Sequence, residues 1–244
     1  MLKLCLESLH VEYVLKKKKT AVAVSSLSLE VPKGQFLGIL GSSGCGKSSV
    51  LKAIAGFFPF DGIIRIDGVD ADKIPTSRRS LAYVSQSYDL YSNLTVFDNV
   101  AFPLRVARLP LEEINQRVTA LAEEMNLTLL LSRKPRQLSL GQLQQVSLAR
   151  AFIRRASLYL LDEPFSNLDF ETKQRLFVFL QRRHEQEMAT IILVSHSFFD
   201  LKKLCQRVVV LGPRASLLQE GTPEAIESHP ASEVVSSLLK EGSL

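Results

Sequence analysis

The segment Gly41–Ser48, GSSGCGKS, is the feature that most restricts how this chain can fold. It matches the phosphate-loop pattern G-x-x-x-x-G-K-[ST] in full, and it lies between a short apolar run over residues 35–40 and a helical pattern over residues 50–57. Glycines let such a loop curl until successive backbone N–H groups face phosphate oxygens, and the helix start adds positive potential. A chance glycine-rich turn does not explain this order of strand, loop, Lys-Ser pair and helix. The segment therefore predicts a phosphate site on an α/β sheet.

The residues of this loop are all expected to take part in nucleotide binding. Lys47 is expected to reach the β- and γ-phosphates, and the Ser48 hydroxyl is expected to ligate Mg²⁺. The expected nucleotide contacts are Gly41, Ser42, Ser43, Gly44, Cys45, Gly46, Lys47, Ser48 and Ser49. Cys45, close to a helix start, is in addition expected to be a thiol whose alkylation inhibits the protein, although a small residue that only fills space is an equal alternative.

Two further apolar strands end in polar residues that suit the chemistry of phosphate cleavage. The run LYLLDEP ends in Asp162 and Glu163, and the run TIILVSHS ends near His196. Asp162 is expected to hold the metal through water, while Glu163 orients and deprotonates an attacking water. His196 is expected to contact the γ-phosphate, because ligands of open α/β sheets bind beyond the carboxyl ends of the strands. The remaining histidines, His10, His184 and His229, lack such context and are interpreted as surface residues.

Hydrophobic patterning divides the chain into strand-rich outer parts and a helical middle. Strands are expected over residues 3–14, 21–31, 35–40, 62–68, 156–162 and 190–197, with a hairpin over 208–221. Helices are expected from residue 50 to an end at Gly56 and over 109–127, 171–186 and 198–207, with Thr222-Pro223 starting another. Leu111, Ile114, Val118, Leu121 and Met125 fall on one apolar helix face and are interpreted as core. Alternating strands and helices predict a parallel sheet into which a helical segment, from about residue 90 to 155, is inserted.

Length, net charge and cysteine spacing limit the class of protein but do not identify its binding partners. The 244 residues suit one large domain, and the net charge of +5 is compatible with polyanions or an anionic surface. Cys5, Cys45 and Cys205 are too widely spaced for a disulfide framework or a zinc site, as in a reducing cytoplasm. No signal peptide and no run near 20 apolar residues is visible, so another chain would span any membrane. The run Lys16–Lys19 is interpreted as a solvated hairpin turn.

Taken together, these motifs closely resemble the ATP-binding subunits of ABC transporters. Besides the phosphate loop and the Asp162–Glu163 pair, LSLGQ at residues 138–142 matches the family signature Leu-Ser-Gly-Gly-Gln apart from Leu140. SNLD at 166–169 looks like the D-loop, His196 like the switch histidine, and Gln86 like the Q-loop glutamine. The resemblance covers almost the whole chain. It implies an α/β fold with a P-loop NTPase core, residues 1–87 and 156–244, an N-terminal antiparallel β-subdomain within it, and an α-helical subdomain at about 88–155.

The resemblance also implies ligands and roles. ATP and Mg²⁺ are the expected cofactors, with Gln86 serving catalysis, nucleotide and metal beside Ser48 and Asp162, and with Tyr13 stacking on adenine or packing in the core. Two copies are expected to pair head to tail. Ser139, Gly141 and Gln142 of one copy then contact the ATP held by the other, through the positive start of the signature helix. Leu140 is expected to alter dimer closure slightly.

The importer class is favoured by a tail, residues 221–239, that resembles the end of the ATPase core in importers of sugars, polyamines and iron. IDGVDADKIPTSRR and VSHSF look most like the ATPases of thiamine importers. The resemblance thus implies membrane permease subunits and, indirectly, a solute-binding protein as partners, no nucleic acid, and a peripheral location on the cytoplasmic face of the inner membrane. Residues 87–104 should form a groove for the permease, or their aromatic side chains are core. Exporter subunits, a soluble ABC ATPase acting on nucleic acid or ribosomes, and a silent regulatory subunit are the alternatives.

Overall fold

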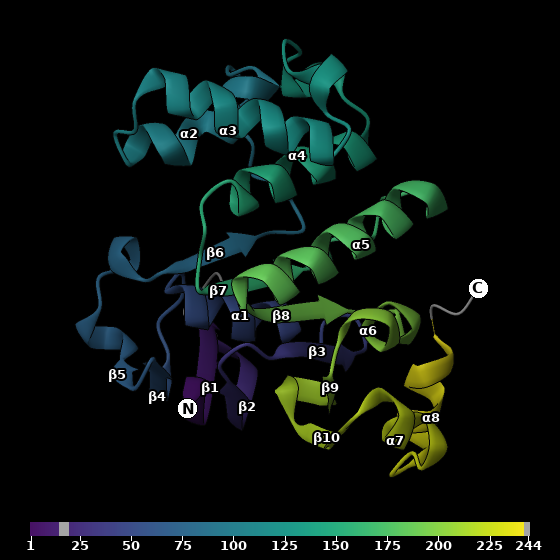
Figure 1. Ribbon diagram of the computed structural model, residues 1–244. Coiled ribbons are helices and arrows are strands. Elements are labelled where there is room, and N and C mark those ends of the chain that lie inside the picture. The colour runs from purple at the N-terminus through teal and green to yellow at the C-terminus, as the bar shows by residue number, and fades with distance from the viewer. Residues whose placement is uncertain (15–19, 242–244) are drawn as a thin grey trace.

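The computed structural model describes residues 1–14 and 20–241. The expected lysine turn at Lys16–Lys19 lies outside the described residues. The chain forms two β-sheets and eight α-helices within the described part, and Figure 1 shows helices α2, α3 and α4 gathered at one end of the molecule.

The smaller sheet is antiparallel and comes from the N-terminal third. Its order is β2-β1-β4-β5, with β1 Leu2–Val14, β2 Thr20–Pro32, β4 Asp61–Ile66 and β5 Val69–Asp70. Alternating apolar residues make these strands, because successive side chains point to opposite faces and only one face is covered. The expected N-terminal antiparallel sheet is confirmed.

The larger sheet carries the phosphate loop. Its order is β10-β9-β3-β8-β7-β6, with β3 Phe36–Gly41, β6 Leu81–Val84, β7 Leu158–Asp162, β8 Thr190–Ser195, β9 Arg207–Leu211 and β10 Leu217–Gly221. The strands from β9 to β6 are parallel, and β10 pairs antiparallel with β9 as the expected hairpin. Strands β3, β7 and β8 are buried throughout because both faces are covered, which is why they read as continuous apolar runs.

Two hydrophobic cores lie on the two faces of this larger sheet. Leu37 and Ile39 of β3 face the core shared with the antiparallel sheet and α1, Lys47–Ala55. Phe36 and Leu40 of the same strand face the second core, shared with the helices of the other layer. Successive side chains of β3 thus pack into opposite cores, so the strand that leads into the phosphate loop is held from both faces of the sheet.

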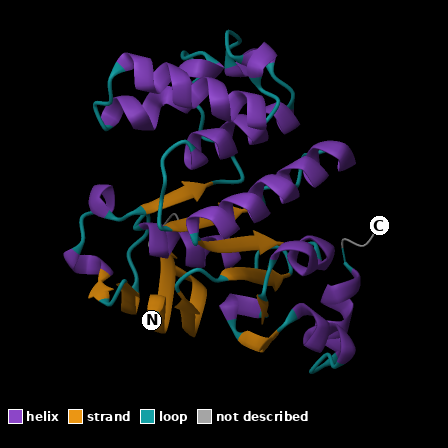
Figure 2. Ribbon diagram, in the orientation of Figure 1, coloured by secondary structure: helices purple, strands orange, loops and turns teal. Residues whose placement is uncertain are grey.

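The other helices cover the second face and the far end. They are α2 Val96–Val106, α3 Leu111–Glu124, α4 Leu140–Phe152, α5 Phe170–Glu187, α6 Phe198–Leu204, α7 Pro223–Ser228 and α8 Glu233–Lys240. Figure 2 shows α5 crossing between the larger sheet and the layer of α2, α3 and α4. These three helices fall within the segment 88–155, and its definition as a separate subdomain stays a prediction. Within the described residues, no helix combines the length and the apolar character that a membrane crossing needs.

Two expectations about helices are wrong in detail. Leu111 is 66% exposed, because it is the first residue of α3 and precedes the turn that packs, whereas Ile114, Val118, Leu121 and Met125 are buried as expected. The helix expected over 198–207 ends at Leu204, since Arg207 already pairs beside Leu37 in the sheet. Pairing with the sheet overrides the local helical pattern there.

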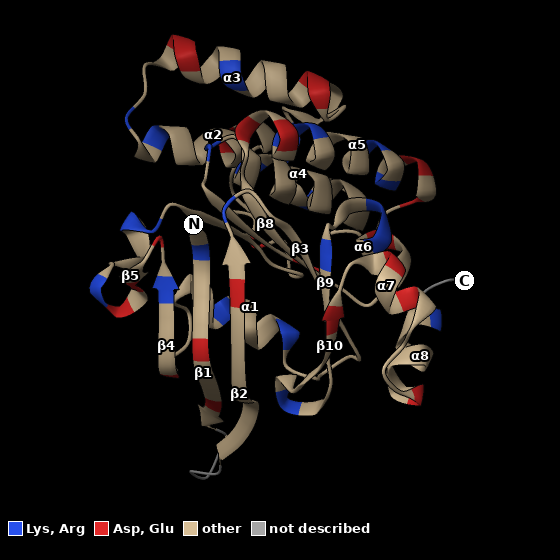
Figure 3. Cartoon of the chain, turned by 60° about the horizontal axis from the view of Figure 1, so that its bottom comes forward, with Lys and Arg blue, Asp and Glu red and all other residues tan. Residues whose placement is uncertain are grey.

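Charged residues of both signs are interspersed over the elements, as Figure 3 shows along α3 and α5. Many form ion pairs along or between neighbouring elements, among them Arg117–Glu113 within α3 and Lys173–Asp200 between α5 and α6. The excess of five positive charges is therefore spread over the molecule and is not concentrated along one helix.

Candidate functional site

The phosphate loop takes its shape from two glycines that leave no room for a side chain. Gly46 has φ +114°, and a Cβ there would lie 2.3 Å from the carbonyl oxygen of Ala23. At Gly41 a Cβ would lie 2.6 Å from the carbonyl oxygen of Leu211. Lys47, the first residue of α1, folds back over the loop and donates from Nζ to the carbonyl oxygens of Gly41 at 2.7 Å and Ser42 at 2.9 Å. The ammonium is thus held at the mouth of the loop.

A hollow of about 310 Å³ adjoins the loop on the side of the antiparallel sheet. It is lined by Tyr13, Ala21, Val22, Ala23, Gly44, Gly46, Lys47, Ser48 and Ser49. The Tyr13 hydroxyl lies 2.7 Å from Ser49 Oγ, and the Tyr13 ring packs edge-on against Phe58. The Tyr13 ring is therefore fixed beside the phosphate loop. Tyr13 belongs to β1 of the antiparallel sheet, whereas the loop follows β3 of the larger sheet. This position suits a base-stacking role for Tyr13, which stays a prediction.

Asp162, the last residue of β7, lies directly across from Ser48. Its Oδ1 accepts from Ser48 Oγ at 2.9 Å, and its Oδ2 accepts from the Tyr83 hydroxyl at 3.1 Å. Burial raises the pKa of Asp162, which is 2% exposed, while the two hydrogen bonds oppose that rise. Burial and then the charge of Asp162 also raise the pKa of Tyr83. The carboxylate is thus held by two neutral hydroxyl donors.

These oxygen donors fit Mg²⁺, which prefers hard oxygen ligands. Gln86 lines a second hollow with Ser48 and Asp162, so all three expected metal residues face one space. Gln86 itself is exposed on the turn after β6. The structure thus brings together the residues of the expected metal site, which come from the phosphate loop, β7 and the turn after β6.

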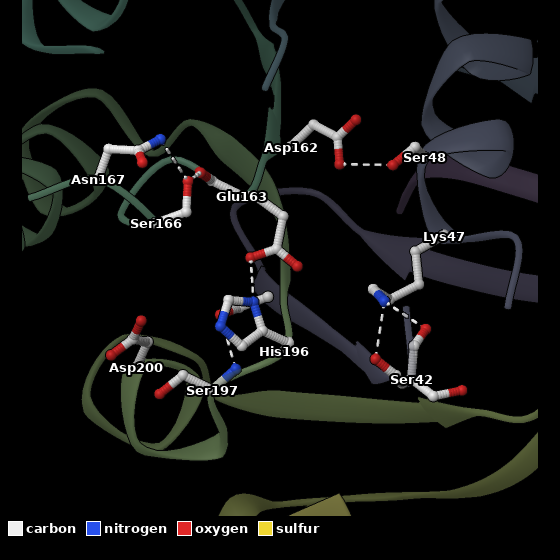
Figure 4. Close-up of polar contacts among 12 residues, drawn as sticks. Ser42, Lys47, Ser48, Asp162, Glu163, Ser166, Asn167, His196, Ser197 and Asp200 are labelled. Atoms are coloured by element: carbon white, nitrogen blue, oxygen red, sulfur yellow. Dashed lines mark hydrogen bonds and ion pairs between the residues drawn. The ribbon is translucent and has the colours of Figure 1, made fainter. Parts of the chain in front are cut away.

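Glu163 and His196 form a pair at the neighbouring strand ends. His196 Nδ1 lies 2.8 Å from Glu163 Oε2, as Figure 4 shows. Burial raises the pKa of Glu163, and the His196 side chain acts in the opposite direction. Glu163 has φ +50°, a left-handed conformation that is uncommon for a residue with a side chain. The carboxylate is mostly buried while His196 is exposed.

The signature helix α4 begins with a capping box. Gln142 N donates to Ser139 Oγ at 3.3 Å, and Ser139 N donates to Gln142 Oε1 at 3.0 Å. Gly141 packs against the loop at residues 166–169, since a Cβ there would lie 3.0 Å from Asn167 O. Ser139 and Leu140 are exposed. The role of Ser139, Gly141 and Gln142 toward a second copy stays a prediction.

The stretch after Gln86 contains side chains that line a hollow and side chains that are buried. Tyr91 and Phe102 line a hollow of about 370 Å³ with Phe57 and Arg150, whereas Val96, Val100 and Leu104 are buried in the core. Arg150 Cζ lies 5.7 Å from the centre of the Tyr91 ring, and burial lowers the pKa of Arg150. Among the aromatic residues, Phe97 is half-buried against the core, whereas Tyr91 is exposed. The groove for the permease stays a prediction.

Two expectations about single residues change. Cys45 is 4% exposed, and its sulfur packs near Gly41 within the core, so the expected easily alkylated thiol is not presented to solvent. Among the histidines, His229 is exposed, but His10 and His184 are half-buried and hydrogen-bonded to the carbonyl oxygens of Ser25 and Ala189.

Sequence reasoning missed three residues of the site. Tyr83 holds Asp162, and the amide of Asn167 donates to the hydroxyl of Tyr88 at 2.7 Å. Tyr83 and Tyr88 lie within three residues of Gln86, and Asn167 lies inside the SNLD motif, which assigned it no role of its own. Their partners lie 79 residues away in each case, so only the fold brings them together.

Known proteins resemble this chain over most of its length. A family model described as ABC transporter matches residues 24–166. The trehalose/maltose import ATP-binding protein MalK of Thermococcus litoralis is 42% identical over 89% of this chain and 60% of its own length. The molybdate/tungstate import ATP-binding protein WtpC of Thermococcus kodakarensis is 42% identical over 87% and 64%, and the spermidine/putrescine import ATP-binding protein PotA of Thermobifida fusca is 38% identical over 90% and 57%. The chain thus spans about 60% of the length of these relatives.

A solved structure gives the same picture of the fold. The ATP-binding cassette MJ0796, in a dimeric post-hydrolysis state bound to ADP and Pi, superposes with a TM-score of 0.84 at 25% identity. The match covers 90% of this chain and 98% of that one. The described α/β architecture, with its antiparallel and mixed sheets, is that of an ATP-binding cassette.

Proposed function

Since the chain belongs to the ABC transporter family, we propose that it is the ATP-binding and ATP-hydrolysing subunit of an importer. In this proposal it energises solute uptake through a separate membrane permease and works on the cytoplasmic face of the cell membrane. The similarity to import ATP-binding proteins at about 40% identity supports the importer class over an exporter.

The observation that carries the proposal is the set of contacts at one edge of the larger sheet. Ser48 is hydrogen-bonded to Asp162, and Glu163 to His196, at the ends of adjacent strands. Lys47 and the loop N–H groups bind the phosphates. Glu163 orients and deprotonates the attacking water, and His196 holds the Glu163 carboxylate and contacts the γ-phosphate. Ser48, Asp162 and Gln86 would hold Mg²⁺, which when bound neutralises charge on the phosphate oxygens.

Two copies of the chain are proposed to pair head to tail. The start of α4 is exposed beside the loop at residues 166–169, and its backbone N–H groups suit an anion. A second copy would supply that anion as the γ-phosphate of its bound ATP, contacted by Ser139, Gly141 and Gln142. The dimeric state described for MJ0796 supports this arrangement.

A permease segment is proposed to occupy the groove lined by Tyr91, Phe102, Phe57 and Arg150. The groove combines aromatic surface with a half-buried guanidinium, and its lining includes Asp89 and Tyr91, three and five residues after Gln86. Aromatic residues and arginine are enriched on surfaces that bind another protein. Movement of the permease would thereby act on the loop that carries Gln86.

The most specific part of the proposal is the identity of the transported solute. The relatives named above import sugars, molybdate or tungstate, and polyamines, so similarity of the ATPase subunit does not select one. Thiamine stays our prediction for the solute. A solute-binding protein would then deliver it to the permease.

The proposal is tested by ATP hydrolysis. The Glu163→Gln variant should bind ATP as tightly as the unaltered chain and lose hydrolysis by roughly 10²–10⁴-fold, because the general base is removed while the loop is intact. Phosphate release and nucleotide-binding fluorescence measure the two properties. Hydrolysis at the normal rate by this variant would remove Glu163 from its role, and no hydrolysis by the unaltered chain would favour a silent regulatory subunit.

Purification separates the proposed partner from the nucleic-acid alternative. The affinity-tagged chain, isolated in mild detergent, is expected to retain a polytopic membrane protein whose addition stimulates ATP hydrolysis. Stimulation by ribosomes or DNA, and none by the membrane protein, would favour a soluble ABC ATPase.

A further inference from the structure

Tyr88 connects two loops of the site that lie far apart in the sequence. It follows Gln86 by two residues, and its hydroxyl accepts a hydrogen bond of 2.7 Å from Nδ2 of Asn167. Asn167 belongs to the loop at residues 166–169, which begins three residues after Glu163. The segment that carries the proposed metal ligand Gln86 is therefore tied to the segment that follows Glu163.

The connection continues from Asn167 to Glu163. Asn167 Nδ2 also donates to Ser166 Oγ at 3.2 Å, and Ser166 Oγ donates to the carbonyl oxygen of Glu163 at 3.2 Å. Figure 4 shows these two bonds leading from Asn167 through Ser166 to Glu163. Three hydrogen bonds thus connect the Tyr88 hydroxyl to the backbone carbonyl of Glu163, the proposed general base.

Tyr88 is held in an unfavourable backbone conformation by the signature helix. Tyr88 and Asp89 have φ of +66° and +46°, and two consecutive left-handed residues with side chains are costly. Ser147 and Arg150 of α4 both donate to the carbonyl oxygen of Tyr88, and Arg150 also donates to that of Asp89 at 2.7 Å. Such strain persists only where surrounding contacts fix it, and here they come from α4.

A buried amide on the same helix lies between these contacts. Gln144 is fully buried, and neither its Oε1 nor its Nε2 has a hydrogen-bond partner among the described residues. It follows Gly141 and precedes Ser147 by three residues, so it lies on the helix face that touches Asn167 at one end and Tyr88 at the other. A buried amide without partners is rare, and such a group requires an explanation.

We propose that Tyr88 is a positioning residue that transmits movement of the Gln86 loop to Glu163 through Asn167. The inference rests on the proposed ATPase function. In the arrangement described, the Tyr88 hydroxyl fixes residues 166–169, and with them the backbone of Glu163. When the Gln86 loop shifts, this bond is released and the Gln144 amide takes a partner in the rearranged junction. The junction of α4, Tyr88 and Asn167 is then an element with two packings.

The test compares Tyr88→Phe with Asn167→Ala and with the double variant. Tyr88→Phe keeps the ring and removes only the acceptor, so kcat should fall about 3–10-fold, the equivalent of one neutral hydrogen bond, with KM for ATP unchanged. The double variant should be no slower than Asn167→Ala, because both changes break the same connection. An unchanged kcat in Tyr88→Phe, or losses that multiply in the double variant, would overturn the proposal.

Tyr159→Phe is the matched control, since it removes a buried tyrosine hydroxyl that bonds to Ala156 N and Arg154 O, away from the site. It should lower the melting temperature and leave kcat unchanged. A loss of kcat equal to that of Tyr88→Phe would mean that general stability sets the rate, and would overturn positioning.

Gln144→Met tests the second arrangement. Replacing an unpaired buried amide by an apolar side chain of similar size should raise the melting temperature and lower kcat, because the resting junction is stabilised. A variant that is less stable and equally active would overturn the second arrangement. These outcomes are separate from failure of the proposed function, which would appear as absence of ATP hydrolysis in the unaltered chain and equal rates for it and Glu163→Gln.

Discussion

Leu140 and Gly141 are neighbours in the signature helix, yet their surroundings differ sharply. Leu140 is the first residue of α4, is 58% exposed, and has a backbone that any residue can adopt. Gly141 faces the carbonyl oxygen of Asn167, and a Cβ there would approach it to 3.0 Å. The family signature has glycine at both positions. This chain replaces the first by Leu140, which is exposed, and keeps the second as Gly141, which is in contact with Asn167. A side chain at the second position would be tight against the loop at residues 166–169.

Leu140→Gly should therefore have a small effect on folding and a measurable effect on the proposed dimer. Glycine at a helix start costs less than the roughly 1 kcal/mol it costs in a helix interior. Removing the exposed leucine relieves bulk at the proposed seam between copies, so ATP-induced dimerisation should shift by a few-fold. Sedimentation with ATP and the ATPase rate measure this, with Gly141→Ala as the damaging comparison. If both quantities are unchanged in Leu140→Gly, the steric role of Leu140 is wrong.

At the scale of elements, the caps of the helices follow from the sequence. Thr222 caps α7 with Pro223 in its first turn, and Gly56 ends α1 at φ +83°, both as predicted. Caps depend on residues only three or four positions apart, so a single sequence contains them. The end of α6 was predicted wrongly because it depends on the pairing of Arg207 beside Leu37, 170 residues earlier.

The cap of α2 makes stability depend on pH. Asp98 accepts from Thr95 Oγ1 at 2.6 Å and pairs with Arg105, and the Thr95 hydrogen bond lowers the pKa of Asp98. A carboxyl whose pKa is lower in the folded state contributes stability above its unfolded pKa, and loses it as the pH falls through the folded value. Asp98→Asn should lower the melting temperature at pH 7 and approach the unaltered chain below about pH 4. A difference independent of pH would mean that the charge is not involved.

At the scale of the molecule, an ion pair ties the layer of α2–α4 to the sheet layer. Arg183 of α5 donates to Glu124 of α3 at 2.6 Å and to Glu187 at 3.1 Å, and its guanidinium lies over Phe179. Because Arg183 is mostly buried, salt screens its ion pairs less than it screens ion pairs at the surface. The two layers are thus joined by charge as well as by the apolar core they share.

Removing either partner of the Arg183–Glu124 ion pair should destabilise the packing of the two layers, and the cost should differ between the two partners. Glu124→Gln should cost about 1 kcal/mol or less, as partly exposed pairs do. Arg183→Met should cost more, about 2–3 kcal/mol, because it also leaves the mostly buried Glu187 short of a partner. Chemical denaturation measures both, and hydrogen exchange in α3 should rise in each. Equal costs, or no change in exchange, would show that the pair does not hold the layers together.

The sequence by itself determined the local parts of this protein: the phosphate loop Gly41–Ser48, the strand and helix alternation, and the helix caps. Each of these depends on short-range spacing, backbone freedom or hydrophobic period, which a single chain displays in order. It also predicted that Asp162, Glu163 and His196 would share one edge, because parallel strands end together. Their roles, with those of Gln86, Tyr13 and Ser139, stay predictions.

The tertiary structure alone decided which side chains meet. Tyr83 on Asp162, Tyr88 on Asn167, the sulfur of Cys45 turned into the core, and the unpaired amide of Gln144 all depend on elements far apart in the sequence. No spacing rule contains such pairings, because packing of the two layers sets the distances between side chains. The hydrophobic pattern predicts that these layers pack, and only their final register fixes the contacts on which the proposed coupling depends.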